Sequence, residues 1–161
     1  MSFNPQFQKV GDILVYQKVI TKKQLSDALE EQKKTKEKLG QILISKAIIT
    51  ENDLTKAYSQ QMGHKHVLEN DLLVLPEDIV SILTEDFARE HHVIAMEKTD
   101  FSIVVAMEDP EDLDAIDGVR KISNLNPEIV IAGRSAIEKA IDKLYGSIKR
   151  SGEIESAISH I

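Results

Sequence analysis

The chain has 161 residues, of which 42% are hydrophobic and 29% charged, a composition typical of a globular protein with one domain or two small ones. It has no cysteine, which excludes disulfides and thiolate metal sites, and it lacks a bilayer-crossing apolar run and a signal-peptide pattern, so we expect a cytoplasmic protein. The net charge of −7 divides into +4 over residues 1–65 and −11 over residues 66–161, which favours anionic ligands at the N-terminal part but not DNA or RNA.

The first third of the chain contains an internal repeat with an offset of 29 residues. Residues 9–32 align with residues 38–61, and nine of the 24 aligned positions are identical. Chance would give about one or two identities at ordinary residue frequencies, so we interpret the repeat as a duplicated supersecondary unit. The identical pairs are Lys9/Lys38, Gly11/Gly40, Ile13/Ile42, Leu14/Leu43, Ile20/Ile49, Thr21/Thr50, Leu25/Leu54, Ala28/Ala57 and Gln32/Gln61.

Each copy is predicted to form two helices. The first begins near Gly11 or Gly40 and carries an Ile-Leu-Val or Ile-Leu-Ile segment. The second follows Thr21 or Thr50, whose hydroxyl groups suit a helix N-cap. The residues on one face of this second helix then follow the spacing i, i+3, i+4 and i+7. They are Leu25, Ala28, Leu29 and Gln32 in one copy and Leu54, Ala57, Tyr58 and Gln61 in the other.

The pattern changes after Gly63, which we expect to end the helical array. The later elements are predicted as helices over residues 76–83, 84–91, 109–123 and 135–145 and strands over 93–98, 101–107 and 128–132. The first two strands are expected to form an antiparallel hairpin. We therefore predict an α+β fold whose parts are a helical subdomain of two duplicated helix pairs over 1–63, a small α/β subdomain with a sheet of about three strands over 64–148, and a flexible tail or linker start over 149–161.

Catalytic signatures are absent from the sequence. It has no Walker A loop to hold nucleotide phosphates, and Gly11 and Gly40 are isolated glycines. The five histidines form no metal-ligand spacing. The acidic run of residues 108–114 fits a helix N-terminus better than a catalytic pair. We therefore expect no enzymatic activity, no catalytic cofactor and no metal site.

The duplicated unit resembles the tandem motif of MshEN-type domains, which stand at the N-termini of type II secretion and type IV pilus assembly ATPases. Each copy reads Lys-apolar-Gly-x-x-apolar-apolar, then apolar-Ile-Thr, then Leu-x-x-Ala-apolar-x-x-Gln, and five residues separate the copies. Later segments, including Leu75-Pro76, residues 105–110 and Tyr145-Gly146, resemble the following part of the same region. The resemblance covers about residues 7–148.

The resemblance implies a site for cyclic di-GMP, a bacterial second messenger, as a regulatory ligand. Two Lys and two Gln would contact its phosphates and guanine edges, and apolar side chains would support the bases. Lys replaces the family's Arg in both copies, which predicts weaker binding because the planar fork of hydrogen bonds is lost. The residues implied are Lys9, Val10, Gly11, Leu25, Leu29, Gln32, Lys38, Leu39, Gly40, Leu54, Tyr58, Gln61 and, from the second subdomain, Asp109.

A structural interpretation stands beside this one. Gly11 and Gly40 would also allow close helix packing, Leu25, Leu54 and Tyr58 would also fill a core, and Gln32 and Gln61 would also solvate a helix end.

Three functions are compared. The first is a regulatory domain that binds cyclic di-GMP and acts on downstream ATPase domains or a partner. The second is a docking module of such an ATPase for an inner-membrane platform protein, without nucleotide binding, which would bring the chain to the membrane surface. The third is a small enzyme that uses the acidic run near Asp109, and it lacks a nucleophile, a metal site and a phosphate loop.

Overall fold

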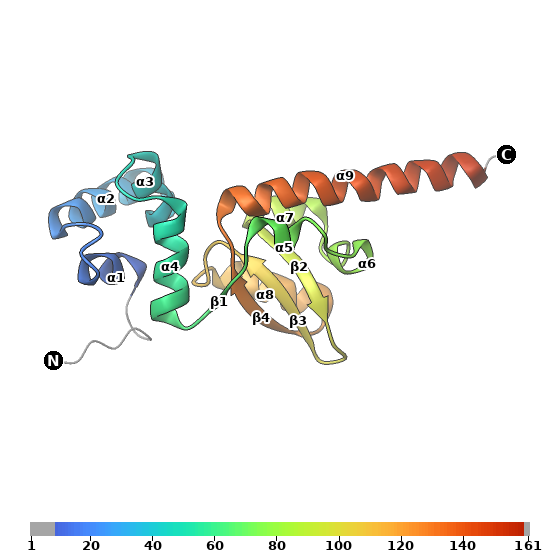
Figure 1. Cartoon of the computed structure of the whole chain (residues 1–161), viewed down its shortest axis with the longest axis horizontal. Helices are drawn as coiled ribbons and strands as arrows, with labels where there is room; N and C mark the ends of the chain where they lie inside the picture. Colours follow the sequence, from blue (N-terminus) through green and yellow to red (C-terminus); the bar gives the residue numbers. More distant parts are fainter. Residues whose placement is uncertain (1–8, 160–161) are drawn as a thin grey trace. The chain divides into compact units, whose positions relative to one another are not determined.

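The computed structural model of the chain describes the backbone of residues 9–159 and, within that range, the side chains of residues 9–60 and 63–152. The chain divides into two compact units, residues 1–64 and residues 65–161 (Figure 1). One unit is helical and the other is built on a four-stranded sheet, so the predicted α+β class is confirmed. In the described part, no helix combines the length and apolar character that a bilayer crossing requires.

The helical unit contains two helix pairs, as the repeat predicts. The first pair is α1, Val10–Tyr16, with α2, Lys22–Thr35, and the second is α3, Leu39–Ser45, with α4, Glu51–Met62. Both predicted N-caps are present, since the hydroxyls of Thr21 and Thr50 each accept a backbone N–H bond at 3.1 Å. Helix α4 ends at Gly63, whose φ of 78° is the left-handed conformation that glycine adopts most easily.

Each helix of one pair packs mainly against a helix of the other pair. Helix α1 lies against α4, and α2 lies against α3, so the first helix of each copy packs on the second helix of the other. The side chains of Ile13, Leu14, Ile42 and Leu43 are fully buried between them. Neither copy can therefore bury its apolar face alone, which explains why the duplicated unit forms one core.

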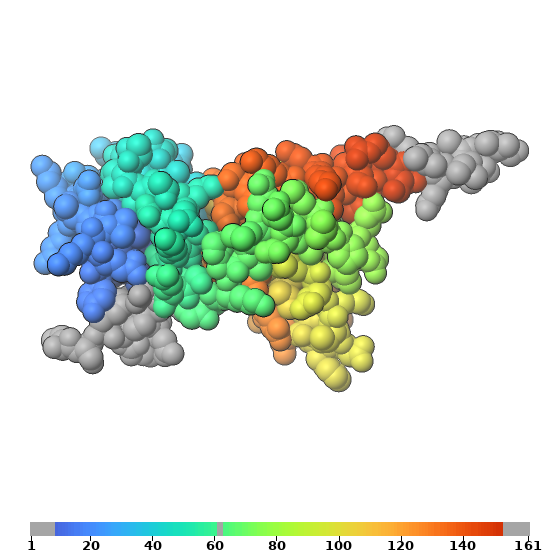
Figure 2. All heavy atoms as spheres, viewed as in Figure 1, coloured from blue at the N-terminus to red at the C-terminus, as the bar shows by residue number. Residues whose placement is uncertain are grey.

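The second unit is a sheet covered by helices on both faces. Its strands are β1, Lys65–His66, β2, Val93–Lys98, β3, Ser102–Met107, and β4, Asn126–Ile131, in the spatial order β1-β4-β3-β2. Strands β2 and β3 form the predicted antiparallel hairpin, which is drawn in yellow (Figure 2). Phe101, in the turn between the two strands, is exposed. Strands β1 and β3 both pair parallel to β4.

Alternate strand residues face two separate cores in this unit. Ile94 and Ala106 pack with α9, Arg134–Ser159, together with the short helices α5, Glu69–Leu72, and α6, Glu77–Val80, and with α7, Glu85–His91. Val93 and Val105 pack on the other face with α8, Leu113–Ser123. The period of two along the strands thus places one set of side chains on each face.

The structure corrects several predicted boundaries. Helix α8 begins at Leu113 instead of Asp109, because the Asp109 carboxylate accepts the Glu111 N–H at 2.9 Å in a turn and Asp112 provides the N-cap. Helix α6 is shorter than the predicted 76–83. Strand β1 and helix α5 were not predicted, since they have only two and four residues.

The last helix is the largest correction. We expected it to end near Tyr145 and residues 149–161 to form a tail, but α9 continues from Arg134 to Ser159. Its core-facing residues keep the helical spacing through the buried Tyr145 to the half-buried Ile148, and no proline interrupts the segment after it. Gly146 and Gly152 weaken a helix without ending it, because their cost of about 1 kcal/mol each is offset by neighbours that favour helix. Residues 160–161 of the expected tail lie outside the described residues.

Candidate ligand-binding site

Lys9 and Lys38 occupy matching places at the starts of α1 and α3. Both have extended backbone angles at the N-cap, and neither side chain makes a cap hydrogen bond. Lys9 is exposed and Lys38 is half-buried. The structure therefore places the two predicted cations at the same point of each repeat, one residue before the helix.

Gly11 and Gly40 are buried beneath leucines of the second helices. A Cβ atom on Gly11 would lie 2.6 Å from Cδ1 of Leu25 and 2.9 Å from Cδ2 of Leu39. A Cβ atom on Gly40 would lie 2.7 Å from Cδ2 of Leu54. All three distances are too short for a real contact, so close helix packing accounts for these two glycines. Direct approach of a ligand to their backbone stays a prediction.

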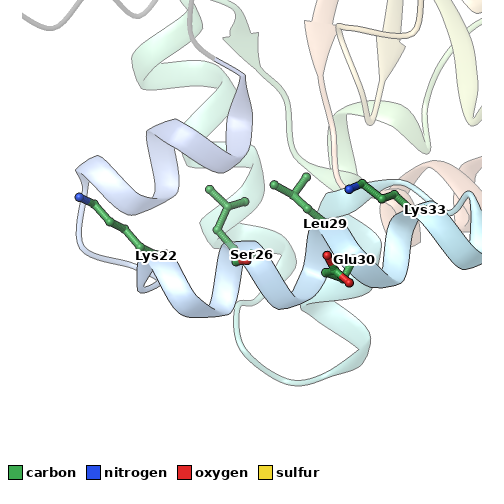
Figure 3. Close-up of a pocket in the computed structure, with 6 residues that line it drawn as sticks. Lys22, Ser26, Leu29, Glu30 and Lys33 are labelled. Carbon is green, nitrogen blue, oxygen red and sulfur yellow. The ribbon is translucent and has the colours of Figure 1, made fainter.

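Helix α2 carries an open groove of about 250 Å³ along one face (Figure 3). Lys22 and Lys33 lie at its two ends, with leucine side chains between them. Leu25 is half-buried, and Leu29 is 40% exposed. Two of the apolar residues predicted to support a base thus lie on an accessible surface. The groove is lined by Lys22, Leu25, Ser26, Leu29, Glu30 and Lys33.

The matching residues of the second repeat are buried. Leu54 is 6% exposed and Tyr58 is 4% exposed, although both were predicted to contact a ligand. Val10, another predicted contact, is also buried, and Leu39 is half-buried. The core interpretation therefore describes Leu54, Tyr58 and Val10 as they stand in this structure.

Gln32 lies at the end of α2, where its amide has a structural partner. Its Nε2 donates a hydrogen bond to the Glu37 carbonyl oxygen at 3.0 Å, which ties the helix end to the spacer between the copies. The Gln32 carbonyl accepts the Lys36 N–H at 2.8 Å, where the chain turns in the left-handed conformation. The side chain of Gln61 lies outside the described residues.

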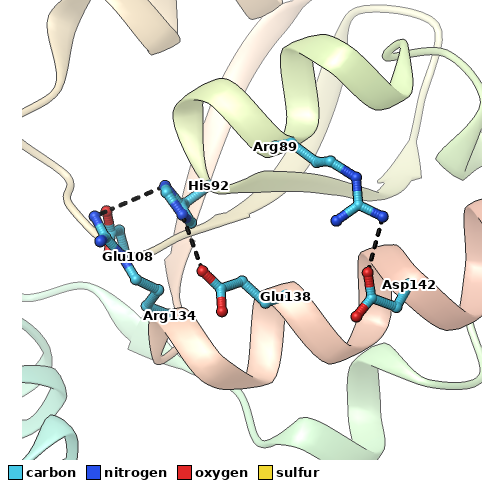
Figure 4. Close-up of polar contacts among 6 residues, drawn as sticks. All are labelled: Arg89, His92, Glu108, Arg134, Glu138 and Asp142. Atoms are coloured by element: carbon cyan, nitrogen blue, oxygen red, sulfur yellow. Dashed lines mark hydrogen bonds and ion pairs between the residues drawn. The ribbon is translucent and has the colours of Figure 1, made fainter.

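The second unit contains a polar network that the sequence did not predict (Figure 4). Arg134 Nε and Nη2 donate to the two carboxylate oxygens of Glu108 at 2.7 and 2.6 Å. His92 lies between two acids, with Nδ1 3.6 Å from Glu108 Oε1 and Nε2 3.3 Å from Glu138 Oε1. These residues come from three distant parts of the sequence, at positions 92, 108 and 134–138, so no local spacing pattern reveals the network. Asp109, the predicted ligand contact of this unit, is half-buried beside Glu108 in the chain.

A second ion-pair group ties α7 to α9. Arg89 donates to Glu85 at 2.9 Å and to Asp142 at 2.8 Å, and Figure 4 shows the latter contact. The hydrogen bonds from Arg89 and then Lys149 lower the pKa of Glu85. The same contacts, first with Glu85 and then with Asp142, raise the pKa of Arg89. Among the described residues, no three His, Cys, Asp or Glu side chains are grouped to hold a metal ion.

Comparisons with known proteins found similarity over both units of the chain. A family model described as the MshEN domain matches residues 62–151. The type IV pilus assembly ATPase PilB of Myxococcus xanthus (strain DK1622) is 32% identical over 137 residues, which is 85% of this chain. Because residues 65–161 number only 97, at least 40 of the matched residues lie in the helical unit. The chain spans 24% of the length of that relative.

Two solved structures share the fold. The structure of MshE with cdg, cyclic di-GMP, has a TM-score of 0.73 and 28% identity, and the match covers 86% of this chain and 99% of that one. The N-terminal domain of XpsE has a TM-score of 0.72 and 21% identity, and the match covers 89% of this chain and 98% of that one.

Proposed function

The chain belongs to the MshEN domain family, and from this premise we propose that it is a non-catalytic regulatory domain that binds cyclic di-GMP. The observation that carries the proposal is the likeness to MshE with cdg over 86% of this chain. Cyclic di-GMP has two guanines and two phosphates, and the helical unit has two copies of one helix pair. A ligand with two similar halves suits a duplicated unit.

Lysines supply the attraction for the phosphates. Residues 1–65 carry a net charge of +4 in a chain whose total is −7, so an anion is steered toward the helical unit. Lys9 and Lys38 stand at matching helix starts, and Lys22 and Lys33 flank the groove on α2. An ammonium group binds phosphate as a point charge, without the planar fork of arginine. We therefore expect weaker binding than in a domain with arginine at both starts.

The groove on α2 offers an apolar surface for one base. Leu25 and Leu29 form its floor, and its volume of about 250 Å³ is below the roughly 300–1,000 Å³ of typical ligand sites. It therefore has room for part of cyclic di-GMP and not for the whole molecule. We retain the sequence-based assignment of the remaining contacts to Val10, Gly11, Gln32, Leu39, Gly40, Leu54, Tyr58, Gln61 and Asp109.

The partners follow from the size of the relative. The chain covers only 24% of the pilus assembly ATPase PilB, so we propose that ATPase domains on the same polypeptide are its first partner. Ligand binding would then alter the motor or its contact with an inner-membrane platform protein. This arrangement places the domain in the cytoplasm, held near the inner membrane by that partner.

Calorimetric titration tests the proposal. The purified chain is titrated with cyclic di-GMP, with GMP as the ligand control, and we expect saturable binding of one cyclic di-GMP per chain. A variant with Gln32→Ala and Gln61→Ala should lose most of the binding, whereas Gln60→Ala, at an exposed neighbouring position, should retain it. Far-UV circular dichroism checks that all variants are folded. Absence of heat from the unmodified chain at saturating ligand would refute the proposal.

A further inference from the structure

The two repeats differ on the helix face that carries the groove. Leu29 and Tyr58 are equivalent, because each stands eight residues after its threonine cap. Yet Leu29 is 40% exposed whereas Tyr58 is 4% exposed. The residue one turn earlier shows the same contrast, since Leu25 is half-buried and Leu54 is buried. The face is open in the first repeat and closed in the second.

The packing partners of the two faces are also equivalent. Helix α2 lies against α3, and α4 lies against α1, so the repeat predicts the same cover for both. Among the groove positions, the largest gain in side-chain atoms between the repeats is from Leu29 to Tyr58. A tyrosine ring fills space that leucine leaves free, and a buried ring contributes more burial free energy than an exposed one. Tyr58 thus places a buried ring where the first repeat has an exposed leucine.

The charges at the two faces differ in the same direction. Lys22 and Lys33 flank the open groove, while the equivalent positions are Glu51 and Met62. Glu30 also lines the groove, so the groove positions carry a formal charge of +1, whereas the equivalent positions of the second repeat carry −1. An anionic nucleotide is therefore attracted more strongly to the first face. Shape and charge thus both favour the first repeat as the initial contact.

We propose, on the basis of the cyclic di-GMP binding proposed above, that Tyr58 gates the second half of the site. One nucleotide half of the ligand docks in the groove on α2, and the other half binds only after the Tyr58 ring has left the interior. The apparent affinity is then the intrinsic affinity multiplied by the fraction of molecules in which this face is open. GMP has a single nucleotide half and needs only the open groove, so its affinity does not depend on the position of the Tyr58 ring.

Exchange of the two equivalent residues tests the gate. Tyr58→Leu reproduces the first repeat in the second, and Leu29→Tyr does the reverse. We expect Tyr58→Leu to tighten cyclic di-GMP binding by at least about fivefold, because the open fraction rises, while GMP binding is unchanged. Leu29→Tyr should weaken both ligands. Tyr58→Phe keeps the ring, so it should tighten cyclic di-GMP binding less than Tyr58→Leu does.

The outcomes separate the gate from the proposed function. If the unmodified chain binds cyclic di-GMP and Tyr58→Leu leaves its affinity unchanged or lower, the gate is refuted and the binding function stands. If neither the unmodified chain nor Tyr58→Leu binds, both are refuted.

A measurement on the unmodified protein covers the case in which Tyr58→Leu does not fold. With 3-fluorotyrosine incorporated, the fluorine resonance of Tyr58 should shift when cyclic di-GMP is added and stay in place with GMP. A Tyr58 resonance that is unmoved by saturating cyclic di-GMP would overturn the gate.

Discussion

Replacement of Arg134 by methionine should destabilise the sheet unit by about 3 kcal/mol. The Glu108 side chain is only 3% exposed, and Arg134 donates to both of its carboxylate oxygens at 2.6 and 2.7 Å. Removing one partner of a buried ion pair typically costs about 3–5 kcal/mol, because the remaining charge is left in the interior. His92, with Nδ1 3.6 Å from Glu108, and the 29% exposure of Arg134 reduce the cost to the lower end.

A double variant isolates the contribution of the buried charge. In Glu108→Gln with Arg134→Met, the carboxylate is gone, so the combined loss of stability should be smaller than the sum of the two single losses. Arg120→Met is the matched control, since Arg120 pairs with Asp117 on the exposed face of α8 and should cost less than about 1 kcal/mol. Both pairs join an arginine to an acid, and only one is buried.

Native-state hydrogen exchange measures these effects in the whole chain. The amides of β3 and β4 report the opening free energy of the sheet unit separately from the helical unit, which a single melting curve cannot do. A loss for Arg134→Met no larger than that for Arg120→Met would refute the reasoning. Strict additivity in the double variant would do the same for the role assigned to the buried charge.

Substitutions at three further positions test single structural features. The Tyr145 hydroxyl donates to the Leu83 carbonyl at 2.7 Å, and burial followed by the Glu85 charge raises its pKa to about 12, so Tyr145→Phe should cost about 1–2 kcal/mol at neutral pH. Since the ordinary tyrosine pKa is 10.0, the unmodified chain should lose stability between pH 10 and 12 in thermal melts, and the variant should lack this step. Thr50→Ala should cost about 1 kcal/mol in urea titrations by removing a capping box. Gly63→Ala should cost about 1 kcal/mol in the same assay, and Gly63→Asn less, because φ is 78°.

Local signals in the sequence predicted most of the fold. The threonine caps, the glycine after α4 and the alternating strands depend on residues within a few positions of each other, so they can be found without tertiary information. Strand β1 could not be found this way, because its two residues become a strand only by pairing with β4. The continuation of α9 past Gly146 is not evident from the sequence, because residues 147–161 have only a weak apolar pattern.

The candidate site was less predictable, because exposure depends on tertiary packing. The repeat predicts the same role for Leu29 and Tyr58, and only the packed structure shows that the first is exposed and the second buried. Likewise, Glu108 and Arg134 stand 26 residues apart, and nothing in either segment marks the other as its partner. Periodicity identifies a helix face but not whether another helix covers it.

The structure also shows what the nine identities in the repeat mean. Packing accounts for the buried isoleucines, leucines and alanines, and for the two glycines beneath Leu25 and Leu54. Capping accounts for the two threonines, and the bond from Gln32 to the spacer gives that glutamine a structural role. Lys9 and Lys38 form another identical pair. Both stand at N-cap positions, where Ser, Thr, Asp or Asn would stabilise the helix, and neither makes a side-chain cap hydrogen bond. Helix formation does not require a lysine there, and in the function proposed above these two lysines attract the two phosphates of cyclic di-GMP.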